Sequence, residues 1–191
     1  MDYLITSLIS YLFGSIPFGY LFTKILLKKD IRDVGSGNIG ATNVLRTGNK
    51  SLGYLTLILD IAKAVVPVIY IKLNYPDLIY LAALCAFLGH LFPVWLKFKG
   101  GKGVATFVGI LISINFYYAL IFGIIWIFTF LISKYSSLSS LLASVSIPIY
   151  LLIFNQGNTI FFVIMFVLIF FTHRENIKRL INKEETKSRI Y

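Results

Sequence analysis

The chain has 191 residues, of which 58% are hydrophobic, with a mean hydropathy of +0.82 and a formal net charge of +10. This composition excludes an ordinary soluble domain and indicates an integral membrane protein. The single cysteine, Cys85, excludes an internal disulfide and a thiolate metal cluster.

Apolar blocks that are long enough, or nearly long enough, to span a membrane follow one another along the chain, and each predicts a helix. They lie at residues 3–23, 52–71, 77–96, 104–133, 138–154 and 158–172. Neither the basic stretch nor the cleavage site of a signal peptide accompanies the first block, so we expect it to be kept as a span. Within it, the run 14–19 contains a proline between two glycines and predicts a kink or a close contact between helices.

The fourth block, 104–133, leaves two alternatives. As one helix it would be about 45 Å long against a hydrocarbon core of about 30 Å, so it is either steeply tilted or broken near residues 113–115. Most of the 18 basic residues fall in three segments, at 23–51, at 97–103 and at 174–189. The positive-inside rule assigns all three segments to the cytoplasm, and only a broken fourth block places them on one side of the membrane.

The sequence therefore predicts an all-α, polytopic integral membrane protein with seven transmembrane helices, some of them short. Its N-terminus is expected outside and its C-terminus in the cytoplasm, and we expect a single domain over residues 1–191. Basic loops that flank spans and face anionic lipid head groups explain the net charge, so we expect no nucleic-acid partner.

The glycine-rich segment 35–46 contains no acidic residue and lies between two apolar blocks. It formally matches the dinucleotide fingerprint G-x-G-x-x-G, but no strand is expected before it, so we reject that interpretation. Backbone amides beside glycines, small hydroxyls, carboxamides and an arginine are groups that bind phosphate. A plain tight turn is the alternative, but the segment has more polar residues than a turn requires. The candidate phosphate-binding residues are Gly35, Ser36, Gly37, Asn38, Gly40, Thr42, Asn43 and Arg46.

The lysine segment 97–103 combines three lysines with glycines at the entry to an apolar block, and it predicts a second anion site. Its candidate residues are Lys97, Gly100, Gly101, Lys102 and Gly103. Basic anchoring of the span would explain Lys97 and Lys99 equally well, whereas Lys102 between two glycines is the better functional candidate. For His90, just upstream, a structural hydrogen bond and a chemical role both remain open.

Two pairs of polar residues lie in or beside the apolar blocks. His173 and Asn176, where the last block leaves the membrane, would share one helix face, and a histidine there is a candidate base, hydrogen-bond donor or phosphate ligand. A solvated helix end is the alternative interpretation. Asp60 and Lys63 lie inside the second block, and intramembrane charges usually pair toward the bundle interior. We interpret them as a structural ion pair lining the site, with direct catalysis as the alternative.

Several catalytic arrangements do not occur in the sequence. It has no cluster of carboxylates for a metal ion, no His-x4-Asp pattern and no G-x-S-x-G nucleophile elbow. We therefore expect no metal and no cofactor, and we expect a substrate that arrives already activated, with positioning and charge stabilisation supplying the rate.

Together these motifs resemble a known family. The runs 14–19, 35–46, 89–106 and 173–179 are similar, in this order, to those of the bacterial membrane-embedded acyl-phosphate:glycerol-3-phosphate acyltransferases. The resemblance implies that a fatty acyl group is transferred from acyl phosphate to the 1-hydroxyl of sn-glycerol 3-phosphate. The products would be lysophosphatidate and phosphate, in the first acylation step of phospholipid synthesis.

The resemblance also implies residue roles and surroundings. The candidate catalytic residues are Ser36, Arg46, Lys102, His173 and Asn176. Glu175 would be structural, and the glycines around Lys102 would bind a substrate phosphate. We expect a monomer in the bacterial cytoplasmic (inner) membrane, with its active site facing the cytoplasm and with membrane lipid, acyl phosphate and glycerol 3-phosphate as partners. A membrane transporter or channel for organic phosphate anions, and an acyltransferase that uses acyl-CoA or acyl carrier protein, are the alternatives.

Overall fold

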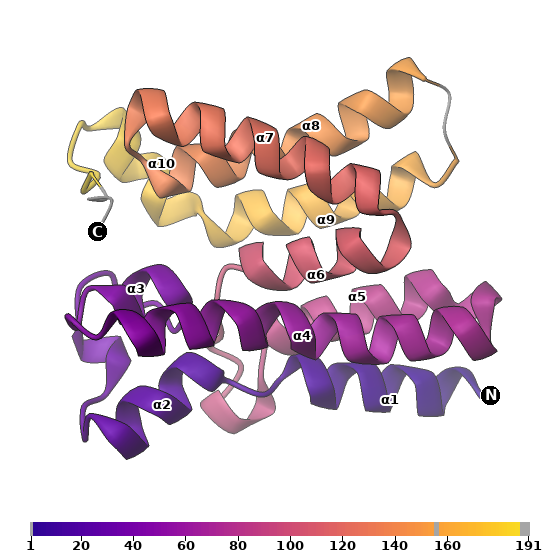
Figure 1. Ribbon diagram of the computed structural model, residues 1–191, viewed down its shortest axis with the longest axis horizontal. Helices are drawn as coiled ribbons and strands as arrows, with labels where there is room; N and C mark the ends of the chain where they lie inside the picture. Colours follow the sequence, from indigo (N-terminus) through magenta and orange to yellow (C-terminus); the bar gives the residue numbers. More distant parts are fainter. Residues whose placement is uncertain (1, 155–156, 188–191) are drawn as a thin grey trace. The chain divides into compact units, whose positions relative to one another are not determined.

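The computed structural model describes residues 2–154 and 157–187. Within these residues the regular structure is helical and no strand occurs. The chain divides into two compact units, Met1–Ile114 and Asn115–Tyr191, each with its own packing (Figure 1). The predicted single domain stays a prediction. Arg189, which belongs to the predicted basic tail, lies outside the described residues.

The first unit is built around a long helix, α4 (Lys50–Asn74), which packs against α1 (Tyr3–Gly14), α5 (Ile79–Leu91) and α6 (Val104–Ile114). Figure 1 shows α4 between α1 and α6. The remaining elements of this unit are α2 (Phe18–Leu26), α3 (Ala41–Leu45), and the short 3-10 helices η1 (Ile31–Asp33), η2 (Pro76–Leu78) and η3 (Val94–Leu96). Close packing depends on glycine, because a Cβ on Gly14 would overlap the carbonyl group of Ala86 in α5.

The first apolar block is one span broken into α1 and α2, which confirms the predicted kink. Pro17 has no N–H to donate to a preceding carbonyl, which favours a break at this point. The hydroxyl of Ser15, just after α1, accepts a hydrogen bond from the indole N–H of Trp95 (2.9 Å). The carbonyl oxygen of Ile16 accepts another from Nζ of Lys63 in α4 (2.8 Å). Two distant parts of the first unit therefore hold the break in place.

In the second unit, α8 (Ser136–Ile153) packs against both α7 (Phe116–Ser133) and α9 (Thr159–Thr172). The indole N–H of Trp126 in α7 donates to the hydroxyl of Ser140 in α8 (3.1 Å). The ring of Tyr118 in α7 lies edge-on to that of Phe162 in α9, with centroids 5.6 Å apart. At His173 the chain turns by 62° into α10 (Arg174–Ile181).

The six predicted apolar blocks are helical, and the fourth is broken as predicted. Asn115 separates α6 from α7, and its side chain caps α7 by accepting a hydrogen bond from the N–H of Tyr117 (3.0 Å). Within the described residues, five helical segments are long and apolar enough to cross a membrane, or six if α9 and α10 form one bent span. Helix α6, with 11 residues, is shorter. The fold is therefore that of an all-helical, polytopic membrane protein, whereas the count of seven spans and the orientation stay predictions.

Candidate functional site

A small apolar cluster underlies the glycine-rich segment 35–46 in the first unit. Its buried members are Ile31, Ile39, Val44, Leu52 and Leu96. Because Leu52 lies in α4 and Leu96 in η3, the cluster joins the segment to two other elements. Burying each such side chain contributes roughly 1.5–3 kcal/mol, so the segment is a folded loop with a defined shape.

Asn43 organises this loop from inside. Its side chain is buried, and the Nδ2 group donates to the carbonyl oxygens of Ile31, Val34 and Asn38 at 2.8–3.1 Å. Its Oδ1 accepts from the backbone N–H of Ser36 (3.1 Å). Both the Nδ2 group and the Oδ1 atom of Asn43 therefore form hydrogen bonds with the backbone of the loop. The sequence places Asn43 among the phosphate-binding residues, but its contacts favour a loop-shaping role.

Gly37, Asn38 and Gly40 form the turn that precedes α3. Gly37 has a φ of +69°, which favours glycine, and Oδ1 of Asn38 accepts from the N–H of Gly40 (2.8 Å). The tight-turn interpretation therefore accounts for these three residues. The exposed side chains of Ser36 and Thr42 are not needed for the turn.

Arg46 is the cation that this loop presents. Gly35 has a φ of +54°, and a Cβ there would lie 2.9 Å from Cδ of Arg46, so the glycine lets the arginine pack along the loop backbone. The guanidinium is half-buried and has no ion-pair partner among the described residues. Arg46 is therefore available to an anionic ligand beside the exposed hydroxyl of Ser36.

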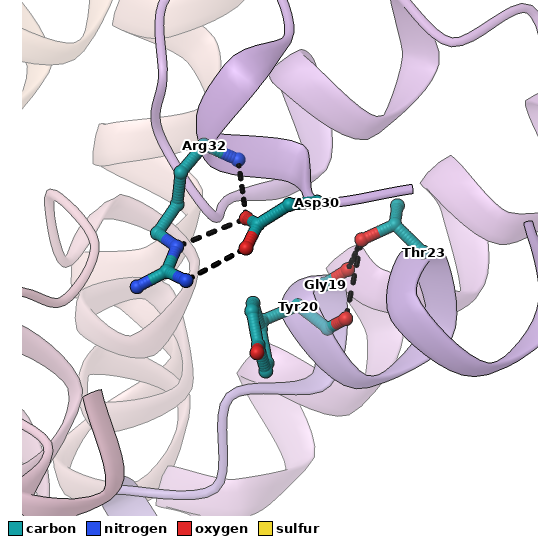
Figure 2. A network of polar contacts seen from close by, with 5 residues as sticks. All are labelled: Gly19, Tyr20, Thr23, Asp30 and Arg32. Atoms are coloured by element: carbon teal, nitrogen blue, oxygen red, sulfur yellow. Dashed lines mark hydrogen bonds and ion pairs between the residues drawn. The ribbon is translucent and has the colours of Figure 1, made fainter. Parts of the chain in front are cut away.

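Arg32, in contrast, is committed to Asp30, as Figure 2 shows. The Asp30 carboxylate accepts from Nε (2.9 Å) and Nη2 (2.6 Å) of Arg32 and from its backbone N–H (3.0 Å). These hydrogen bonds from Arg32 lower the pKa of Asp30 to about 2. The guanidinium also lies over the ring of Tyr20, 5.0 Å from its centroid. The two arginines of the loop region thus differ in what they can bind.

The lysine segment 97–103 folds back onto the end of α5. The N–H groups of Gly100 and Gly101 donate to the carbonyl oxygens of Leu91 (3.0 Å) and His90 (3.1 Å). A Cβ on Gly101 would overlap the imidazole of His90, and a Cβ on Gly103 would overlap the ring of Phe87. The glycines are therefore required for close packing on α5, a reason that differs from the predicted binding of phosphate by their amides.

The three lysines of this segment differ in environment. Lys97 and Lys99 are exposed, whereas Lys102 is half-buried between the two packed glycines. Lys97 and the next residue, Phe98, have φ values of +52° and +60°. Such left-handed conformations cost free energy in residues other than glycine and concentrate at functional sites.

His90 is buried, and its imidazole lies between Asp60 in α4 and Gly101 in the lysine segment. Its Nδ1 is 4.0 Å from Oδ1 of Asp60, which pairs with Nζ of Lys63 at 2.7 Å. This burial favours the structural alternative for His90. The Asp60–Lys63 pair is formed as the sequence predicts.

In the second unit, His173 occupies the bend between α9 and α10 and is 2% exposed. Its Nδ1 lies 2.8 Å from the carbonyl oxygen of Ile169. A carbonyl can only accept, so Nδ1 carries the proton, and in the neutral ring Nε2 carries the lone pair. This is the tautomer that a general base acting through Nε2 requires.

Asn176 is tied to Glu185, a residue that the sequence analysis missed. Oε1 of Glu185 accepts from Nδ2 of Asn176 (2.7 Å) and from the hydroxyl of Ser137 in α8 (2.9 Å), and Oε2 accepts from Nε of Arg179 (2.7 Å). Burial alone would raise the pKa of Glu185, but these three hydrogen bonds outweigh it and lower the pKa. The only signal in the sequence is an acidic residue within a basic tail.

Glu175, for which the resemblance implies a structural role, has an exposed side chain. It makes long ion pairs with Arg174 (3.8 Å) and Lys178 (3.5 Å) on the surface of α10. Exposed pairs of this kind contribute little to stability. Glu185, by contrast, bridges α10 and α8, and the structural role of Glu175 stays a prediction.

Comparison with known proteins gives consistent results. The family model described as glycerol-3-phosphate acyltransferase matches residues 4–183. A glycerol-3-phosphate acyltransferase of Pelagibacter ubique is 71% identical over 191 residues, which is the whole of both chains. One from Brucella anthropi is 49% identical over 180 residues, covering 93% of this chain and 89% of its own.

Two solved structures also match. One is the glycerol 3-phosphate form of PlsY (YgiH), described as an integral membrane glycerol 3-phosphate acyltransferase. It matches with a TM-score of 0.90 and 36% sequence identity, and the match covers 97% of this chain and 94% of that one. The other is the lysophosphatidic acid form of PlsY, with a TM-score of 0.87 at 35% identity and the same coverage.

Proposed function

The chain belongs to the glycerol-3-phosphate acyltransferase family and is an enzyme of that activity in an integral membrane setting, and we propose that its acyl donor is acyl phosphate. The observation that carries the activity is the 71% identity over the full length of both chains. The donor is supported by the likeness to PlsY and by its chemistry, because an acyl phosphate is a mixed anhydride that can be attacked directly without a covalent enzyme intermediate. Because the chain belongs to an acyltransferase family, we do not pursue the alternative of a transporter or channel.

The reaction is a direct transfer. The 1-hydroxyl of glycerol 3-phosphate attacks the carbonyl carbon of the mixed anhydride, the new ester bond forms, and the carbon–oxygen bond to phosphate breaks. Both substrates carry phosphate, and charge builds on the carbonyl oxygen and on the departing phosphate. Fixed cations stabilise such charge without reorganisation during the reaction.

The residues divide into two roles. Arg46 and Lys102 bind phosphate, because one is a cation without an ion-pair partner among the described residues and the other is held by packed glycines. Ser36 hydrogen-bonds the substrate near the attacking hydroxyl. In the second unit, His173 receives the hydroxyl proton through Nε2, and Asn176, oriented by Glu185, hydrogen-bonds the substrate.

The acyl chain is placed in an apolar groove of the first unit. The groove has a volume of about 400 Å³ and is lined by Ile16, Pro17, Tyr20, Leu21, Trp95 and Leu96. It lies at the break of the first span, where a chain can enter from the membrane. We place the N-terminus outside and the C-terminus inside with seven spans, so that the basic segments and the site face the cytoplasm of a bacterial inner membrane, and we expect a monomer.

The experiment that tests the donor uses purified protein in detergent, supplied with glycerol 3-phosphate. Acyl phosphate, acyl-CoA and acyl carrier protein are offered side by side, and lysophosphatidate and phosphate are measured. We expect both products from acyl phosphate alone. Turnover with a thioester donor but none with acyl phosphate would overturn the proposal. Lys102→Ala and His173→Ala are the active-site variants, and full activity in both would reject the residue assignment.

A further inference from the structure

Asp60, Lys63 and His90 form a buried polar cluster that the proposed chemistry does not use. The side chains of Asp60 and Lys63 are 3% and 2% exposed, and that of His90 is 4% exposed. Nδ1 of His90 has no hydrogen-bond partner among the described residues. A charge placed near the middle of a membrane span costs about 2.5–3.5 kcal/mol on insertion scales, so such residues call for an explanation.

Stability alone is a poor explanation for this cluster. Replacing a buried ion pair with apolar side chains of similar volume is often neutral or stabilising. A polar pair is retained where it fixes geometry, and here Lys63 also reaches the carbonyl oxygen of Ile16 at the break of the first span (2.8 Å). The pair therefore ties α4 to the break and presents the Asp60 carboxylate toward α5.

The imidazole of His90 lies between this ion pair and the lysine segment. One edge of the ring, at Nδ1, faces Asp60, and the opposite edge, at Nε2, is covered by Gly101. The carbonyl oxygen of His90 also accepts from the N–H of Gly101 (3.1 Å). Gly101 directly precedes Lys102, so the orientation of the ring sets the position from which the Lys102 side chain extends.

We propose that His90, packed between the Asp60–Lys63 pair and Gly101, is a positioning residue that fixes the backbone at Gly101 and thereby the ammonium group of Lys102. The inference rests on the proposed role of Lys102 in binding phosphate. A displacement of about 1 Å at a reacting group can cost about 100-fold in rate, so a fixed loop has catalytic value.

The first test couples His90 to Gly101. A methyl group on Gly101 would overlap the imidazole, so Gly101→Ala alone should lower kcat/KM on the order of 10- to 100-fold. In a His90→Ala background the space is open, and the same substitution should cost less than threefold. Gly123→Ala, with nothing within 4 Å of its Cβ, is the matched glycine control. Equal losses in both backgrounds would overturn the coupling between the ring and the loop.

The second test removes the ion pair while keeping volume. The double variant Asp60→Leu with Lys63→Met should stay folded, with an unchanged melting temperature, but lose at least tenfold in kcat/KM. Wild-type kinetics in this double variant would assign the pair to packing alone and overturn its part in positioning. A variant that fails to fold is replaced by Lys63→Met with Asp60→Asn, which keeps a polar group facing His90.

The third test separates this inference from the proposed function, because it needs no catalysis. Lys102→Cys is made in a Cys85→Ser background, and the rate of thiol modification by a charged maleimide is measured with and without His90→Ala. We expect at least a threefold change in rate at position 102 and none at Thr42→Cys, an exposed control in the other loop. An unchanged rate at position 102 overturns the positioning role, whereas a changed rate together with an active Lys102→Ala enzyme would reject only the proposed role of Lys102.

Discussion

The carboxamide of Asn176 donates a hydrogen bond of 2.7 Å to the carboxylate of Glu185, nine residues further along the chain. The same carboxylate accepts from Ser137 and Arg179, so Glu185 joins α8 to α10. Asn176 is buried, and its Oδ1 has no hydrogen-bond partner among the described residues. Because Nδ2 is held by Glu185, Oδ1 is the atom that we propose accepts a hydrogen bond from the substrate.

Replacing Glu185 with alanine should impair both stability and catalysis. The substitution leaves the buried donors of Asn176 and Ser137 without their partner, and a buried unsatisfied group costs about 1–3 kcal/mol. We expect a lower melting temperature in detergent and at least a tenfold lower kcat. Glu175→Ala is the matched control, since its exposed ion pairs contribute about 0–1 kcal/mol. Similar melting temperatures for the two variants would contradict the structural role of Glu185.

The stability contributed by Glu185 should depend on pH with a definite sign. Its pKa in the folded state is lowered from the ordinary value of 4.5. The stabilisation is therefore fully present above that value and is lost as the pH falls through the folded-state pKa. Melting temperatures of wild type and Glu185→Gln, measured from pH 7 down to pH 3, should differ most at neutral pH and converge in acid. A gap that widens in acid would have the wrong sign.

Arg46 and Arg32 provide a matched pair of substitutions within one loop region. Arg46→Ala removes the cation that we propose binds a substrate phosphate. A hydrogen bond to a charged group contributes about 1.5–3 kcal/mol, so we expect a loss of roughly 10- to 100-fold in kcat/KM. Arg32→Ala should change kcat/KM less than threefold, because its guanidinium is already bound by Asp30. Initial rates at varied glycerol 3-phosphate compare the two. The reverse order would reject the assignment of Arg46.

Asn43 and Thr42 are neighbours that should separate folding from function. Asn43→Asp replaces a donor with an acceptor that faces three carbonyl oxygens, so the loop should open and the enzyme should lose both thermal stability and activity. Thr42→Val removes an exposed hydroxyl and should leave the melting temperature unchanged. Limited proteolysis of the loop, together with activity, distinguishes the variants. A stable Asn43→Asp protein would show that the loop does not depend on this side chain.

The helices were predictable from the sequence because each apolar block is long enough to demand one. Even the break at Asn115 followed from block length and from the distribution of lysine and arginine, which are properties of the chain alone. The break before Pro17 was equally local, since the run 14–19 places a proline, which lacks an N–H, between two glycines. What these patterns could not give is the number of spans, because α6 is shorter than a spanning helix and α9 bends into α10.

The candidate site was less predictable, for a physical reason. The sequence predicts Gly101 and Gly103 to be phosphate-binding glycines. In the structure, glycine is required there because His90 and Phe87 pack against these two positions. Which side chains pack against a glycine cannot be predicted from the sequence alone. The burial of Asn43 likewise cannot be predicted from the sequence, because it lies among polar residues of the loop. Glu185 was missed because its role is defined by Asn176 and by Ser137, which precedes it by 48 residues.

The spacing of Asp60 and Lys63 has a consequence for how the protein is assembled. The two residues lie three apart on the same helix and pair at 2.7 Å, so they can neutralise each other without a partner on a neighbouring helix. Helix α4 can therefore enter the bilayer carrying no net charge at its centre, at a lower cost than two separate charges would impose. A pair divided between two helices would leave each of them charged during insertion.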